Sequence, residues 1–196
     1  MSLDIAAQVM ESYRQIDQDI ETFQTETQLH CPTGCGWCCE NPNVEATPLE
    51  MLPLVLELFQ RGEVDQWLQQ AEDSDFQGQC IFYKTDPFVM GNGRCQVYLW
   101  RPTICRLFGF ATVTSKSGEV QLAACVRHKA AMPDIVAQTQ VLIDQKTVHP
   151  PNFADISQQI ASLEPGFGHQ ALPINEALKV AVQKVGLYLQ MLGQNE

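Results

Sequence analysis

The sequence predicts a mainly α-helical protein with a small irregular or β, cysteine-rich metal-binding centre, an α+β arrangement in a single domain of residues 1–196. Three observations favour this fold class. Apolar residues recur at helical spacing near both ends of the chain, and this periodicity fades between residues 74 and 125. All eight cysteines lie between residues 31 and 125, so we expect the metal-binding centre in the middle of the chain.

The composition is that of an ordinary globular protein, with 45% apolar and 18% charged residues. A formal net charge of −11 argues against nucleic-acid binding, which needs a basic face. Seven of the twelve basic residues, but only two of the 23 acidic ones, lie between Lys84 and Lys129. This positive interval either offsets the negative charge of a four-thiolate metal site or is an ordinary solvated surface.

The N-terminal residues Met1-Ser2-Leu3-Asp4 lack the basic start of a secretory signal, and no apolar run approaches the roughly 18 residues that span a membrane. We therefore expect a cytoplasmic protein with no membrane partner. Disulfides are rare in a reducing cytoplasm, where clustered cysteines more often serve metal or redox chemistry. A disulfide framework is the alternative.

Residues 1–29 are predicted to form an N-terminal helix. Apolar residues step by three or four along it and so share one helical face: Ile5, Val9, Tyr13, Ile16, Ile20 and Phe23. This stripe is expected to pack into the core, and the helix leads directly into the first cysteines.

The clearest helix start in the chain is Thr47-Pro48-Leu49-Glu50. Threonine suits the N-cap, proline the first helical position, and glutamate the third position beyond the cap. This helix should end near Arg61-Gly62, and a shorter one is predicted over residues 63–72.

Between residues 74 and 125 the apolar runs are short and glycines separate them, which predicts two or three short strands or irregular loops. Turns are expected at residues 91–93 and 117–118. The C-terminal region, residues 130–196, is expected to be helical again, with helices over 133–148, over 153–163 and from Pro173 onward. An apolar stripe marks the last of these: Ile174, Leu178, Ala181, Val185, Tyr188 and Leu192.

The segment Cys31-Pro-Thr-Gly-Cys35-Gly-Trp-Cys38-Cys39 places four thiols within nine residues, and we call it the cysteine loop. Thiolates hold soft metal centres, and turns rich in Pro and Gly let neighbouring thiols converge. Adjacent side chains on a helix diverge by about 100°, so Cys38 and Cys39 share one centre only if the local backbone is irregular.

Iron–sulfur and zinc sites both use thiolates. Zinc modules typically pair two short Cys-x2-4-Cys segments across a spacer, whereas here four cysteines are packed into one loop and the later ones are widely spaced. This clustering favours an iron–sulfur cluster, with zinc as the alternative.

The submotif Cys31-x3-Cys35-x-Trp37-Cys38 resembles the cluster loop of radical S-adenosylmethionine enzymes, in which three ligands leave one iron open for substrate. Those enzymes need most of a β/α barrel after the loop, whereas the residues from 40 onward begin with helices. Cys39 would also have no role in such a loop.

A second resemblance covers roughly residues 31–129. The cysteine loop and the later block Cys95-Gln-Val-Tyr98-Leu-Trp-Arg101-Pro102-Thr-Ile-Cys105-Arg106 resemble the YkgJ-type CxxCxxCC cysteine-cluster family. That family is described as zinc- or iron-chelating, or more loosely as an iron–sulfur oxidoreductase. In many members the first spacing is two residues rather than three, so the ligand geometry can differ here.

The resemblance implies one cysteine-cluster metal-binding region over residues 31–129, with little indication of a reaction. Flagellin lysine methylases carry a similar domain, which leaves a protein-modifying activity open and makes a protein redox partner or a protein substrate a candidate partner. The metal site is implied to be shared by all eight cysteines: Cys31, Cys35, Cys38, Cys39, Cys80, Cys95, Cys105 and Cys125.

Within the resembling block, Arg101 and Arg106 are candidate donors to cluster sulfurs or to an anionic ligand, or else they are salt-bridge arginines. Tyr98 is expected to pack, and Pro102 to shape the turn before Cys105. Two histidines also flank cysteines and are candidates to replace a thiol ligand: His30 beside Cys31, and His128 beside Cys125.

The sequence therefore predicts a metal-binding protein whose cysteines hold an iron–sulfur cluster for electron transfer, redox sensing or a modification reaction. The alternative is a zinc-binding structural or interaction module without catalytic activity, and metal delivery is a third reading. Neither a Gly-x-Ser-x-Gly nucleophile motif nor a phosphate loop is found, so the sequence leaves open whether the protein is an enzyme.

Overall fold

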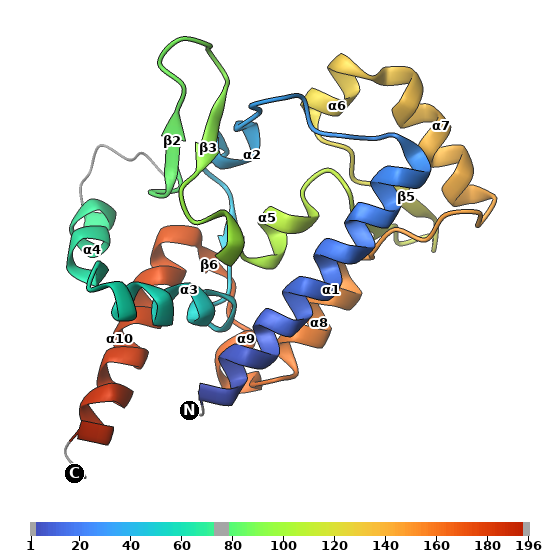
Figure 1. Ribbon diagram of the computed structural model, residues 1–196. Helices are drawn as coiled ribbons and strands as arrows, with labels where there is room; N and C mark the ends of the chain where they lie inside the picture. The colour runs from blue at the N-terminus through green and yellow to red at the C-terminus, as the bar shows by residue number, and fades with distance from the viewer. Residues whose placement is uncertain (1–2, 73–78, 194–196) are drawn as a thin grey trace.

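A computed structural model describes residues 3–72 and 79–193 of the chain; the few residues outside these ranges are not considered further. Within the described residues most of the chain is helical, and three small antiparallel strand pairs add the β component (Figure 1). The predicted fold class is confirmed.

The long first helix, α1 (Leu3–Thr27), lies along one side of the molecule (Figure 1). Its predicted apolar stripe faces the core, because five of the six residues are buried and Ile5 is half-buried. Gln28, with φ of 59°, follows the helix in the left-handed conformation. The chain then turns away into the cysteine loop.

α3 (Pro48–Arg61) begins with the predicted capping box. Glu50 N donates to Thr47 Oγ1 at 3.3 Å, and Thr47 N donates to Glu50 Oε2 at 2.7 Å. Pro48 is the first helical residue, and Gly62, with φ of 67°, ends the helix. The shorter helix α4 (Val64–Glu72) follows.

α10 (Ile174–Gly193) and α1 both pack against α3, and we call these three helices the helical frame. The predicted stripe of α10 is buried from Ile174 to Val185, whereas Leu192 near its end is exposed. The strands β1 (Glu45–Ala46) and β6 (Leu172–Pro173) pair just before α3 and α10, so they join the starts of both helices.

The residues 28–39 and 79–125, which we call the cysteine region, contain two hairpins. One pairs β2 (Tyr83–Thr85) with β3 (Gly93–Cys95), and the other pairs β4 (Thr112–Thr114) with β5 (Val120–Leu122). Each strand buries at most one of its three residues. The hairpins therefore contribute little core of their own.

Several short helices of the described chain were not predicted from the sequence. They are α2 (Trp37–Glu40), the 3₁₀ turn η2 (Tyr98–Trp100), α5 (Thr103–Leu107), α6 (Val126–Ala131) and α9 (Pro165–Gly168). They are too short to show a clear apolar period, which is the signal that identifies longer helices.

Two C-terminal helices, α7 (Pro133–Asp144) and α8 (Phe153–Ala161), lie where helices were predicted. α7 ends four residues before the predicted position 148 because Lys146 takes a left-handed φ of 56° and Thr147 N donates to Leu142 O instead. None of the helices within the described residues is long and apolar enough to cross a membrane.

Candidate metal centre

The cysteine loop is attached to the β2–β3 hairpin by its backbone. Gly93 N donates to Gly34 O at 2.9 Å, and Cys35 forms an antiparallel bridge with Asn92. Gly34 has φ of 73°, a conformation that favours glycine. In Figure 1 the hairpin accordingly lies beside α2, which carries the end of the loop. The cysteines of the loop and Cys95 on β3 are thereby brought to the same place.

The ring of Tyr83 packs between the backbones of Gly36 and Gly93. A Cβ atom at either glycine would lie within 2.4 Å of Tyr83 Cε2, so neither position has room for a side chain. The Tyr83 hydroxyl donates to Glu40 Oε1 and to Asn92 O, both at 3.1 Å. Tyr83 thus fixes the loop to the hairpin, a role that the sequence analysis missed because these residues are far apart in the chain.

Cys105 is positioned by the helical frame. It lies on α5, which begins after Pro102, and Cys105 N donates to Pro102 O at 3.0 Å. Thr103 N donates to Glu50 Oε1 at 3.1 Å, so the carboxylate that caps α3 also anchors the first turn of α5. Pro102 shapes the turn before Cys105 as expected.

Seven of the eight cysteines line one cavity of about 680 Å³, and all eight are free thiols. As they stand, no three His, Cys, Asp or Glu side chains among the described residues are arranged so that they could hold a metal ion. The thiols therefore line the same cavity without forming a ready set of ligands, and ligation would require their side chains to turn toward one another. The cavity-lining thiols are Cys31, Cys35, Cys38, Cys39, Cys80, Cys95 and Cys105.

Cys38 and Cys39 lie next to each other on the single turn α2, with their sulfur atoms 4.0 Å apart. The hydrogen bond between the two sulfurs lowers the pKa of Cys38 and raises that of Cys39, and burial adds to the rise at Cys39. Cys38 is therefore the thiol of this pair that ionises first.

Burial raises the pKa of four more cavity thiols, and the charge of Cys38 adds to this effect at each of them. Because metals bind thiolates, ligation by these groups would release protons. The four are Cys31 and Cys80, whose pKa values rise to about 12, together with Cys95 and Cys105.

The two candidate arginines have different surroundings. Arg106 is 4% exposed, forms an ion pair with Asp17, and donates to the carbonyls of Leu99 and Arg101. Its guanidinium also lies over the ring of Tyr13 on α1, 4.3 Å from the centroid. Although it borders the cavity, every one of these contacts joins α5 to its neighbours, so its surroundings are those of a structural residue.

Arg101 is half-buried at the cavity wall, and its positive charge helps to lower the pKa of Cys38 and partly offsets the rise in pKa at Cys31, Cys95 and Cys105. Its Nη1 donates to Cys105 O at 3.2 Å, and its guanidinium lies 3.5 Å from the centroid of the Tyr98 ring. Tyr98 is 60% exposed, so it supports Arg101 rather than packing in the core as expected. Arg101 is thus the arginine placed to offset thiolate charge.

Cys125 is not among the residues that line the cavity, although its charge raises the pKa of Cys31. It begins α6, where His128 N donates to Cys125 Sγ at 3.3 Å. His128 is fully buried, and burial lowers its pKa, whereas His30 beside Cys31 is exposed. The two histidines that are candidate ligands on sequence grounds therefore differ in their surroundings, since His128 is buried and His30 is exposed.

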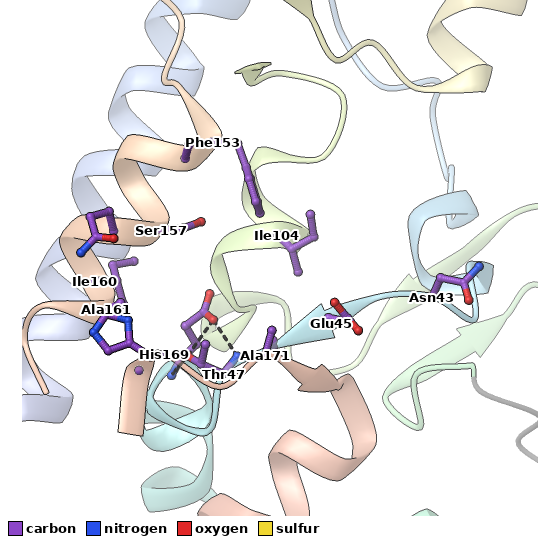
Figure 2. A pocket seen from close by; sticks show the side chains of 15 residues that line it. Asn43, Glu45, Thr47, Ile104, Phe153, Ser157, Ile160, Ala161, His169 and Ala171 are labelled. Carbon is purple, nitrogen blue, oxygen red and sulfur yellow. Dashed lines mark hydrogen bonds between the residues drawn. The ribbon is translucent and has the colours of Figure 1, made fainter. Parts of the chain in front are cut away.

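A second cavity, of about 500 Å³, lies away from the thiols. Figure 2 shows Ser157 and His169 on one side of it and Glu45 and Asn43 on the other. None of the residues lining it is a cysteine, although Ile104 on α5 links it to the turn that carries Cys105. We do not assign the metal to this cavity.

The tip of the β2–β3 hairpin is apolar and exposed. Phe88 and Met90 are 91% and 99% exposed, and the strands below them place Lys84 directly opposite Arg94. Like charges in such a pair repel one another. The face of the protein next to the cysteine loop therefore combines apolar and basic groups.

The donors present are of the kind that a metal group held by thiolates needs, because seven free thiols face one cavity and Arg101 provides a compensating charge, although their side chains would have to turn toward one another to ligate it. The family model CxxCxxCC, "Putative zinc- or iron-chelating domain", matches residues 30–139, which is more than half of the chain and includes all eight cysteines. Neither a curated protein nor a solved structure matches the chain.

Proposed function

The chain belongs to the CxxCxxCC family, and from this premise we propose that its clustered cysteines hold an iron–sulfur cluster in a reducing cytoplasm. The observation that supports the proposal best is the single cavity lined by seven free thiols from four separate segments of the chain. Clusters of this kind are held by cysteine thiolates.

A bound cluster would supply one-electron chemistry, suited to electron transfer, redox sensing or a modification reaction. The protein contributes the positions of the ligands and the charges around them. Tyr83 and Glu50 fix the loop and α5, and Arg101 offsets part of the negative charge of the thiolates. We place the contact with a protein redox partner or protein substrate at the hairpin tip, because Phe88 and Met90 are exposed there.

A zinc-binding structural or interaction module without catalytic activity is the second candidate, and one observation favours it. The sulfur atoms of Cys38 and Cys39 are 4.0 Å apart. Two thiolates at about 2.3 Å from one tetrahedral zinc ion lie roughly 3.8 Å from each other, so this pair needs little movement to share a zinc ion.

Reconstitution distinguishes the two candidates. The protein, purified without oxygen, is incubated with iron and sulfide, desalted, and then reduced while its visible and electron paramagnetic resonance spectra are recorded. We expect a visible chromophore that is bleached on reduction and a paramagnetic signal in the reduced state. Protein that takes up zinc but forms no chromophore would contradict the cluster and support the structural module.

A further inference from the structure

The cavity of about 500 Å³ that lies away from the thiols has the size of a small-molecule site, and we call it the second cavity. Ligand pockets typically occupy roughly 300–1,000 Å³. Four segments that are distant in sequence line it: residues 43–50 around β1, the helix α5, the helix α8, and residues 168–171 before β6. The second cavity is therefore a product of the fold rather than of one loop.

Two walls of the second cavity are fixed by close contacts. Gly168 packs so tightly on α8 that a Cβ there would lie 2.7 Å from Ala161 Cα and 2.9 Å from Ala161 O. The carboxylate of Glu50 joins α3 to α5, because Thr103 N donates to Oε1 at 3.1 Å and Thr47 N donates to Oε2 at 2.7 Å. These walls are in place without a ligand, as they are in most ligand pockets.

Part of the lining is apolar. Phe153, Ile104 and Ile160 are its largest apolar side chains. Figure 2 shows Phe153 and Ser157 on the side of α8 that faces Ile104 of α5. The space between these two helices is therefore suited to the hydrocarbon part of a ligand, which gains free energy by leaving water.

Several polar groups of the lining have no partner. None of the described residues donates to, or accepts from, the hydroxyl of Ser157, the carboxylate of Glu45 or the imidazole of His169. Ser157 is half-buried, whereas Glu45 and His169 are exposed and lie at the rim, on different sides of the second cavity (Figure 2). A mostly apolar lining with a few unpaired polar groups is typical of small-molecule sites.

The charge of the lining favours one kind of ligand. None of the described residues that line the second cavity is a lysine or an arginine, and its two carboxylates are those of Glu45 and Glu50. Glu50 already accepts hydrogen bonds from Thr47 and Thr103, so Glu45 is the carboxylate that a ligand can pair with. A cationic group would gain a charge-assisted hydrogen bond there, whereas an anionic group would be repelled.

We propose that the second cavity binds a small protonated amine, whose ammonium group pairs with Glu45 and whose hydrocarbon part lies against Phe153 and Ile104. The inference goes beyond the proposed function and does not depend on it, since no cysteine is among the described residues that line this cavity. The two cavities nevertheless share α5, because Ile104 lines one and Cys105 lines the other.

Calorimetric titration of the full chain, purified without oxygen, tests the inference with three probes that share a phenyl ring. They are phenethylamine, which is protonated at neutral pH, the neutral phenethyl alcohol and the anionic phenylacetate. We expect the amine to bind about 5-fold more tightly than the alcohol, which is the upper end for an exposed ion pair, and phenylacetate to bind most weakly. The absence of saturable amine binding, or equal affinity for the three probes, would overturn the inference.

Two variants locate the bound amine. Glu45→Gln should bring the affinity for the amine down to that for the alcohol, whereas Glu26→Gln on α1 removes the same charge from an exposed residue outside the lining and should change nothing. Ser157→Phe fills the space beside α5 and should abolish binding of both probes. Metal content should match the parent in all three variants. Amine affinity that is unchanged in Glu45→Gln, or in folded Ser157→Phe, would contradict the assigned site.

Discussion

The helical frame and the cysteine region bury their residues in different ways. In the frame, large apolar side chains such as Tyr13, Leu58 and Leu178 are at most 1% exposed and belong to regular helices. In the cysteine region each hairpin strand buries at most one of its three residues, and the tip residues Phe88 and Met90 are almost fully exposed. The hairpin strands therefore bury fewer apolar side chains than the helices of the frame do.

The frame is therefore stabilised mainly by apolar burial, whereas in the cysteine region Ile81, Phe82 and Leu107 join the same core but the hairpins and the cysteine loop depend more on a few specific contacts. Tyr83 joins the loop to the hairpin, and Glu50 joins α5 to α3. These contacts position the thiols but leave them facing a cavity. We infer that metal ligation completes this region, and the following predictions test whether the two parts respond differently.

Metal removal should have the largest effect, and mainly on the cysteine region. Metal binding contributes about 10–16 kcal/mol in small zinc modules, and a large part of such a contribution should be lost here. Hydrogen exchange, measured with and without bound metal, should show faster exchange over residues 79–125 and continued protection in α3 and α10.

Cys35→Ser and Cys105→Ser should each lose metal and reproduce that exchange pattern, because both thiols line the cavity. Full metal content and parental protection in either variant would remove that cysteine from the ligand set. If hydrogen exchange remained equally slow in both regions after metal removal, the cysteine region would not depend on metal more than the frame does.

Leu58→Ala should destabilise the frame by about 2–5 kcal/mol, because it removes a fully buried side chain and leaves a cavity. Denaturant unfolding of the metal-bound protein measures the loss of stability. The metal content of the folded variant shows whether the cysteine region is affected as well. We expect full metal content under native conditions. Loss of metal without loss of global stability would mean that the two regions are not stabilised separately.

Gly36→Ala should cost about 1–3 kcal/mol, since its Cβ would lie 2.4 Å from Tyr83 Cε2 and must displace the ring or the loop. Metal affinity should fall together with stability because the loop carries four of the cysteines. Gly186→Ala on α10 is the matched control, as its nearest new contact is an ordinary 3.5 Å from Phe59 Cζ. Equal melting temperatures for the two variants would refute the role assigned to Tyr83.

Arg101→Ala should have the smallest effect on folding, within about 0.5 kcal/mol, because the side chain is half-buried at the surface. It should instead lower the midpoint potential of a bound cluster, since removing a positive charge beside the thiolates disfavours the added electron. Arg106→Ala is the contrast, and should cost about 1.5–3 kcal/mol through its lost hydrogen bonds. A redox titration of Arg101→Ala that matches the parent would leave Arg101 without an electrostatic role.

The frame could be predicted from the sequence because its signals are local. The capping box of Thr47 and Glu50 lies within four residues, and the stripes of α1 and α10 repeat at helical spacing. The last turns of α10 deviate from the pattern, because Leu192 continues the stripe but is exposed.

The arrangement of the site was harder to predict because its contacts join distant residues. The spacing of the cysteines indicated a metal site, but the separation of Cys125 from the other seven depends on where α6 begins. Tyr83 joins the loop to the hairpin only because its ring lies between Gly36 and Gly93, which belong to different segments of the chain. The positions of Arg101 and Arg106, one at the cavity wall and one buried against Tyr13, also follow from tertiary packing rather than from sequence pattern.

The most direct test of the central claim is the content of iron, zinc and acid-labile sulfide in protein purified without oxygen, with its visible spectrum. A cluster held by the cavity thiols predicts iron and sulfide in equal amounts, about four of each per chain for a four-iron cluster, with broad visible absorbance. Zinc without sulfide, in colourless protein, would contradict the cluster and identify the cysteine region as a structural zinc module.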